Sequence, residues 1–186
     1  ARMMFSLDIL LMSRPFPGSV PPADLLASLP TPFLQLTDFG LSRFVSPSSP
    51  LLSTRCGSEA YAAPELLMGK QYDGRQTDTW ALGVVLFAII TGELPFMEEI
   101  EGKRRAYLMK VAKGQYTWPE QGTEGARLAT PELKELVHRL LTREPEKRAR
   151  VEDIWRSDWM QGSGRPEIVQ GWISQGENGS IDGWNR

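Results

Sequence analysis

The residues best suited to chemistry begin at Asp38, in the run Leu36-Thr37-Asp38-Phe39-Gly40. The stretch before it, Phe33 to Thr37, alternates weakly between apolar and polar residues and predicts a short strand. A carboxylate placed directly after a strand can face a cleft at the end of that strand. Carboxylate oxygens are the ligands that a hard cation such as Mg²⁺ prefers. The pattern therefore indicates a metal-binding acid.

Further short motifs follow Asp38 along the chain. In chain order they are Cys56-Gly57-Ser58-Glu59-Ala60-Tyr61, Ala63-Pro64-Glu65, Asp78-x-Trp80-x-x-Gly83, Gly92-x-x-Pro95-Phe96 and Pro145-x-x-Arg148. In this order and spacing the set resembles the C-terminal lobe of the eukaryotic protein kinases. The chain looks most like the serine/threonine kinases of the calcium/calmodulin-dependent and AMP-activated group. The resemblance covers about residues 6 to 160.

The resemblance implies transfer of the γ-phosphoryl group of ATP to Ser or Thr of protein substrates, with ATP and Mg²⁺ as cofactors. It places Asp38 on the metal that bridges the nucleotide phosphates. Phe39 would pack inward to fix Asp38, and Gly40 would let the backbone swing, so all three belong to the cofactor site. Asp8 falls where the family has a metal-binding Asn and is the second candidate metal ligand.

The resemblance also implies a regulatory site and a substrate loop. Thr54 lies where similar kinases carry the activating phosphate, and Arg2 falls where the family's catalytic-loop Arg would meet that phosphate. Gly57 and Ser58 resemble a serine/threonine-type substrate loop, with Tyr61 packed beneath it. The partners expected from this arrangement are protein substrates and an upstream activating kinase.

Three residues have structural roles by resemblance. Glu65 and Arg148 match the family's buried ion pair between the substrate loop and a late helix. Asp78 matches a residue whose carboxylate accepts backbone N–H bonds from the catalytic loop. The alternative for Asp78 is a simple helix N-cap.

The catalytic loop departs from the family. If Ile9–Leu11 is the strand after that loop, Met3 takes the position of the catalytic-base Asp, Phe5 that of the Lys and Ala1 that of the His. Met3 cannot accept a proton from a substrate hydroxyl. We therefore expect no intact catalytic residue.

The organisation of the chain follows from the same comparison. Residues 1–160 are expected to form a partial kinase domain without the N-terminal lobe, because the chain shows no Gly-rich phosphate loop and no strand Lys paired with a helical Glu. Residues 12–32 are a Pro-rich insert, and residues 161–186 are expected to be a loose tail. The chain is interpreted as a truncated kinase that is inactive alone, or as the product of an incorrect gene model. The alternative is a pseudokinase or a C-lobe-only module that binds proteins without catalysis.

The element that must position these residues is the apolar run Trp80 to Ile90. Its length, a cap at Thr77 or Asp78 and a Gly92 C-cap favour a helix, although its β-branched residues leave a buried strand as the alternative. A helix with no polar face should be buried all round. The predicted fold is mainly α, with helices around this central helix and one small β-hairpin.

The other predicted elements surround this run. Strands are predicted at Ile9–Leu11 and Phe33–Thr37, and an exposed loop is predicted at Ser46–Ser53. The predicted helices are Ala63–Met68, Lys103–Lys113, one that begins at Pro131 with Thr130 as its N-cap, and Val151–Trp159.

Composition narrows the class of protein. The chain has 186 residues, with 21 basic and 23 acidic residues and a formal charge of −2. Without a basic excess, nucleic-acid binding is not expected, and the apolar run is shorter than the roughly 20 residues that cross a bilayer. Cys56 is the only cysteine, so no intrachain disulfide can form. We expect a cytoplasmic location and leave a nuclear one open.

Overall fold

The computed structural model describes residues 2–4, 10–12, 34–37, 39–46, 48–97, 104–120 and 122–161. Asp8, Asp38, most of the Pro-rich segment and the tail after Gln161 lie outside these ranges, so the expectations for them are not addressed. In chain order the elements are β1 (Arg2–Met4), β2 (Leu10–Met12), β3 (Leu34–Leu36), η1 (Phe39–Leu41), β4 (Arg43–Val45), β5 (Leu51–Leu52), η2 (Glu59–Tyr61), α2 (Pro64–Leu67), β6 (Tyr72–Asp73), α3 (Gly74–Thr91), α4 (Arg104–Lys113), α5 (Glu124–Leu128), α6 (Pro131–Leu140), α7 (Val151–Trp155) and α8 (Asp158–Gln161).

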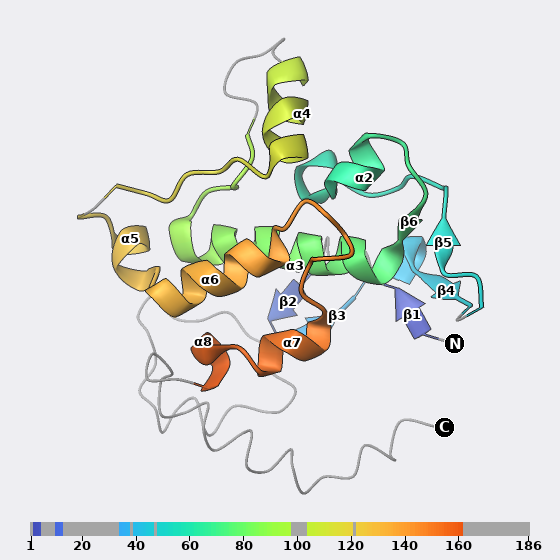
Figure 1. Cartoon of the computed structure of the whole chain (residues 1–186). Helices are drawn as coiled ribbons and strands as arrows, with labels where there is room; N and C mark the ends of the chain where they lie inside the picture. Colours follow the sequence, from blue (N-terminus) through green and yellow to red (C-terminus); the bar gives the residue numbers. More distant parts are fainter. Residues whose placement is uncertain are drawn as a thin grey trace, which may run out of the picture.

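The apolar run forms a helix, α3, which crosses the middle of the molecule (Figure 1). Its N-cap is Asp73, whose carboxylate accepts a hydrogen bond of 3.0 Å from the backbone N–H of Arg75. The expected cap at Thr77 or Asp78 is wrong, because the helix begins earlier and the Thr77 hydroxyl donates back to the Gly74 carbonyl within it. Gly92 ends the helix in the left-handed conformation, with φ 78°, as predicted.

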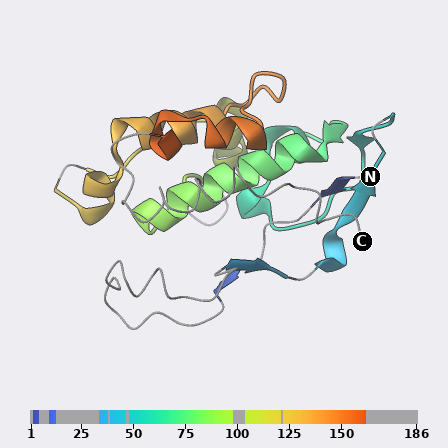
Figure 2. The same ribbon diagram turned by 90° about the horizontal axis from the view of Figure 1, so that it is seen from below.

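Helix α3 is buried over most of its circumference, but not all of it. Trp80 and Val84 are fully buried and Phe87 is almost so, whereas the Ile89 side chain is 70% exposed. The expectation of burial all round is therefore wrong at the C-terminal end of the helix. In Figure 2 helices α6–α8 lie along one side of α3, and the β2–β3 pair lies on the other.

Helix α6 supplies the largest contact with α3. Pro131 occupies its first turn, and the Thr130 hydroxyl caps it by accepting a 3.3 Å hydrogen bond from the Leu133 backbone N–H. Its apolar stripe, expected from the helical spacing of these residues, is buried. The stripe consists of Leu133, Leu136, Val137, Leu140 and Leu141.

The strands form three separate two-stranded antiparallel sheets, β1–β4, β2–β3 and β5–β6. The β2–β3 pair is the predicted hairpin, with Leu11 opposite Gln35. Strand β5 lies within the stretch expected to be an exposed loop, and Leu52 is buried there against Tyr72. That expectation is wrong because an apolar pair inside a Ser- and Pro-rich segment is enough to pair with β6.

Two helical expectations also differ from the structure. The single helix expected at Val151–Trp159 is two short helices, α7 and α8, separated at Arg156 and Ser157. The Ser157 hydroxyl donates to the Ile154 carbonyl and accepts from the Met160 backbone N–H, so it ends one helix and opens the next. Helix α5 was not predicted from the sequence. Its five residues are too few to show a helical period.

Candidate functional site

The segment around the candidate metal-binding acid is described only in part. Phe39 and Gly40 begin the short helix η1, but Asp38 itself lies outside the described residues. The Phe39 side chain is 48% exposed, so it does not pack inward as expected. Strand β4 follows η1, and β1 pairs with it, which places Met3 opposite Phe44. The position expected for the catalytic base is thus beside the chain that leaves Gly40.

The ion pair expected between Glu65 and Arg148 is present. Two parallel hydrogen bonds join the guanidinium of Arg148 to the Glu65 carboxylate, at 2.8 and 3.0 Å. Both side chains are almost completely buried. Arg148 also donates to the carbonyls of Thr142 and Gln76, each at 2.8 Å. A buried guanidinium with this many partners holds α2, α3 and the segment after α6 together.

Aromatic side chains surround this pair. The ring of Trp80 stacks on Phe96 with centroids 5.5 Å apart, and the guanidinium of Arg148 lies 5.1 Å from the Trp80 ring centre. Phe87, Tyr116 and Trp118 continue the cluster through edge and tilted contacts. A cation above an indole ring is stabilised by the ring quadrupole. The charged anchor of the substrate loop is therefore built into the main core.

The predicted substrate loop has a second anchor, on α4. The Glu59 carboxylate accepts hydrogen bonds of 2.7 and 2.6 Å from the Arg104 guanidinium, and the Glu59 carbonyl accepts one of 2.8 Å from the Tyr107 hydroxyl. The Arg104 hydrogen bond lowers the pKa of Glu59. Gly57 and Ser58, just before η2, are exposed, and Tyr61 packs against the main core. No sequence pattern predicts the Arg104 contact, because it joins positions far apart in the chain.

Thr54 is exposed, but its backbone is held. The Tyr72 hydroxyl donates to the Thr54 carbonyl, and the Tyr72 ring packs with Val45 and Leu52. Burial raises the pKa of Tyr72, the charges of Cys56 and Asp78 add to the rise, and the charge of Arg43 opposes it. Arg43, Cys56 and Asp78 therefore lie near enough to Tyr72 to influence its hydroxyl.

Arg2 approaches the same region through the backbone. It lies opposite Val45 in the β1–β4 pair, and Val45 belongs to the small cluster with Tyr72. Neither Tyr72 nor Arg43 was singled out from the sequence. Arg43 falls on β4, where alternation shows which face a side chain takes but not what lies across from it.

Asp78 lies inside α3 rather than at its N-cap. It is half-buried and close enough to Tyr72 to raise the pKa of that phenol. Of the catalytic-loop segment expected to donate to it, only Arg2–Met4 lie within the described ranges. Its role therefore stays a prediction.

Among the described residues, no group of three His, Cys, Asp or Glu side chains could hold a metal ion. The candidate ligands Asp8 and Asp38 are not among them. No helix in the described ranges is long and apolar enough to cross a membrane.

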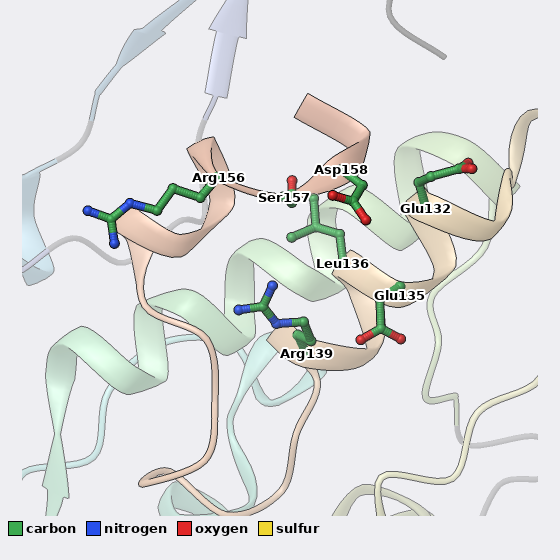
Figure 3. A pocket seen from close by; sticks show the side chains of 7 residues that line it. All are labelled: Glu132, Glu135, Leu136, Arg139, Arg156, Ser157 and Asp158. Atoms are coloured by element: carbon green, nitrogen blue, oxygen red, sulfur yellow. The ribbon is translucent and has the colours of Figure 1, made fainter. Parts of the chain in front are cut away.

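A small hollow of about 80 Å³ lies between α6 and the α7–α8 junction (Figure 3). Leu136 lies at its middle, while Arg156 and Glu132 point away from it. Acidic side chains lie on one side of it in Figure 3 and the two arginines, Arg139 and Arg156, on the other. None of the predicted site residues lines it. The lining residues are Glu132, Glu135, Leu136, Arg139, Arg156, Ser157 and Asp158.

Comparison with known proteins gives a consistent result. The family model for the protein kinase domain matches residues 20–160. Human SNF-related serine/threonine-protein kinase is 39% identical over 129 residues, which cover 69% of this chain and 15% of that protein. The probable serine/threonine-protein kinase MARK-A of Dictyostelium discoideum is 40% identical over 131 residues, covering 70% of this chain and 11% of that protein.

A plant protein is similar to the same extent. CBL-interacting protein kinase 8 of Oryza sativa subsp. japonica is 37% identical over 133 residues, which cover 72% of this chain and 28% of that protein. The chain thus spans between 11% and 28% of the length of these relatives.

Proposed function

The chain belongs to the protein kinase family, by its relatives to the serine/threonine kinases, and from that premise we propose that it forms the substrate-binding part of such an enzyme. The reaction would be transfer of the γ-phosphoryl group of ATP to a Ser or Thr hydroxyl of a protein. The order and spacing of its motifs support the finer proposal that this enzyme is similar to the calcium/calmodulin-dependent and AMP-activated group.

The observation that carries this proposal is the double anchoring of an exposed loop. Gly57 and Ser58 are exposed, yet the loop that follows is fastened by the buried Glu65–Arg148 pair and by the Glu59–Arg104 pair. A loop of small residues on a rigid support leaves room for an extended peptide while keeping its own geometry. The chain's contribution would be to bind and orient the hydroxyl-bearing residue of a substrate.

ATP and Mg²⁺ are the cofactors that the family generally uses. Asp38, with Asp8 as a second ligand, would hold the metal, and Phe39 and Gly40 would border the cofactor site. A bound Mg²⁺ would neutralise the negative charge that develops on the phosphates. The described residues contain no metal-binding cluster of their own, so the proposal for the cofactors depends on these two acids.

Thr54 is proposed as a regulatory phosphorylation site for an upstream kinase. Its side chain is exposed, while its carbonyl is held by Tyr72, so a phosphate could be added without unfolding the segment. A phosphate carries nearly two negative charges and would be attracted by Arg2 and Arg43, which lie on the paired strands β1 and β4.

A phosphoryl-transfer assay on this chain with ATP, Mg²⁺ and a Ser-containing peptide tests the activity. We expect no turnover above background, because a thioether at Met3 cannot act as a base. Turnover that is abolished by Asp38→Ala would overturn the proposed inactivity. A longer product of the same gene, with a Gly-rich loop, a strand Lys and His-Arg-Asp at the junction, should be active if the enzyme proposal holds.

The second candidate is a pseudokinase or a lobe that only binds proteins. Met3 and Phe5 in the catalytic loop favour it. If a longer product proves inactive but retains a peptide on the substrate loop, this candidate replaces the first.

A further inference from the structure

Helix α4 holds a single residue of the substrate loop at two points. Arg104, at the start of the helix, donates two hydrogen bonds of 2.7 and 2.6 Å to the Glu59 carboxylate. Tyr107, one turn further along, donates a 2.8 Å hydrogen bond to the Glu59 carbonyl. Side chain and backbone of Glu59 are therefore both tied to α4, which stands beside α2 at the edge of the molecule (Figure 1).

We propose that Arg104 and Tyr107 are positioning residues for the substrate loop, so that the place of α4 sets the place of Ser58 and Tyr61. This proposal rests on the proposed function for the meaning of the loop, but not for the coupling itself. In this proposal, a displacement of α4 displaces the substrate loop with it.

The turn geometry explains why holding Glu59 holds its neighbours. The Glu59 carbonyl also accepts the Ala62 backbone N–H at 3.1 Å, and the Ser58 carbonyl accepts the Tyr61 N–H at 3.2 Å. The short helix η2 is therefore built on the same carbonyl that Tyr107 contacts. A shift of α4 would be passed to this turn through Tyr107, whose ring is itself buried in the main core.

The two contacts should respond differently to solution conditions. The Arg104 and Glu59 side chains are 60% and 50% exposed, so this ion pair is screened by salt and contributes little to global stability. The Tyr107 contact is partly buried and involves no net charge, so salt should leave it intact. Arg104 thus confers a salt-sensitive restraint on the loop, and Tyr107 a salt-insensitive one.

A charge-swap cycle on the full chain tests the coupling. The variants are Arg104→Glu, Glu59→Arg and both together, with Arg105→Glu as the control for charge at a neighbouring exposed position of the same helix. The readout is backbone amide hydrogen exchange of residues 57–62, referred to the amides of α6. We expect each single variant to speed loop exchange by about twofold to fivefold at low salt. The double variant should return to the original rate, and α6 should not change.

Tyr107→Phe should raise loop exchange by about twofold to tenfold at low and at high salt. Equal exchange in all variants, or no rescue in the double variant, would overturn the proposal.

The effect of these variants on activity is a separate measurement. In any longer product that turns over, Arg104→Glu should raise KM for a Ser peptide more than it lowers kcat. Coupled exchange in this chain, together with a longer product that does not turn over, would uphold the positioning role and reject the proposed activity. Turnover by the longer product with uncoupled exchange would do the reverse.

Discussion

The guanidinium of Arg148 lies 5.1 Å from the centre of the Trp80 indole, while its nitrogens bind the Glu65 carboxylate. Through this contact the Glu65–Arg148 ion pair, at the end of the predicted substrate loop, packs against Trp80 of α3. The ion pair and the hydrophobic core are therefore in direct contact. Removal of the Glu65 carboxylate should therefore lower the stability of the whole domain.

Glu65→Ala should lower the free energy of unfolding by about 3–5 kcal/mol, because it leaves the Arg148 guanidinium buried without its carboxylate. Urea denaturation followed by tryptophan fluorescence measures the change. The matched control is Glu144→Ala, which removes the partner of Arg143 in an exposed pair and should leave the unfolding midpoint unchanged. A midpoint for the Glu65 variant equal to that of the control would show that the pair is not needed.

Tyr72→Phe should loosen the segment that carries Thr54. The ring would still pack with Val45 and Leu52, but the hydrogen bond to the Thr54 carbonyl would be lost, at a cost of about 1 kcal/mol. Trypsin can report this locally, because Arg55 is exposed in the same segment. We expect faster cleavage after Arg55 in the variant. Tyr116→Phe, which alters a ring in the main core, should not speed this cleavage.

Gly83→Ala should destabilise the contact between α3 and α6. A methyl group there would lie 2.9 Å from Leu140 Cβ and from Leu141 Cδ2, which is too close for either to remain in place. Overpacking of this kind costs about 1–3 kcal/mol, more than the gain in helix propensity returns. Thermal unfolding of Gly83→Ala, Leu141→Ala and the double variant measures this loss of stability. The double variant should lose less stability than the two single losses added together.

The pH dependence of stability should include a loss in the alkaline range. Burial, with a smaller contribution from the charge of Glu135, raises the pKa of Tyr116 to about 12, from the ordinary value of 10 that the unfolded chain has. Above pH 10 the unfolded phenol has lost its proton and the folded one has not, so rising pH favours unfolding until about pH 12. Tyr116→Phe should flatten this part of the stability profile. Absorbance near 295 nm should show a late phenol titration that is lost in Tyr116→Phe, and ionisation of Tyr116 at an ordinary pKa would contradict the prediction.

Part of the fold could be read from local patterns alone. The sequence predicted α3 and its C-cap at Gly92, the capped start of α6 at Thr130 and the proline at the start of α2, because such signals depend on neighbours in the chain. The N-terminal end of α3 was misplaced because Asp73, Thr77 and Asp78 can all cap, and only the hydrogen bonds separate them.

The resemblance of the motifs supplied the ion pair between Glu65 and Arg148, which no local pattern would have joined. The links from Glu59 to Arg104 and from Tyr72 to Thr54 had no signal in the sequence. Each joins two residues that are distant along the chain and that come into contact only when the other elements pack around α3. What the sequence determined by itself was therefore the helices α2, α3, α4 and α6 and the resemblance to the family. Which exposed residues hold the substrate loop was decided only by the tertiary structure, because a hydrogen bond between distant residues depends on where both backbones come to rest.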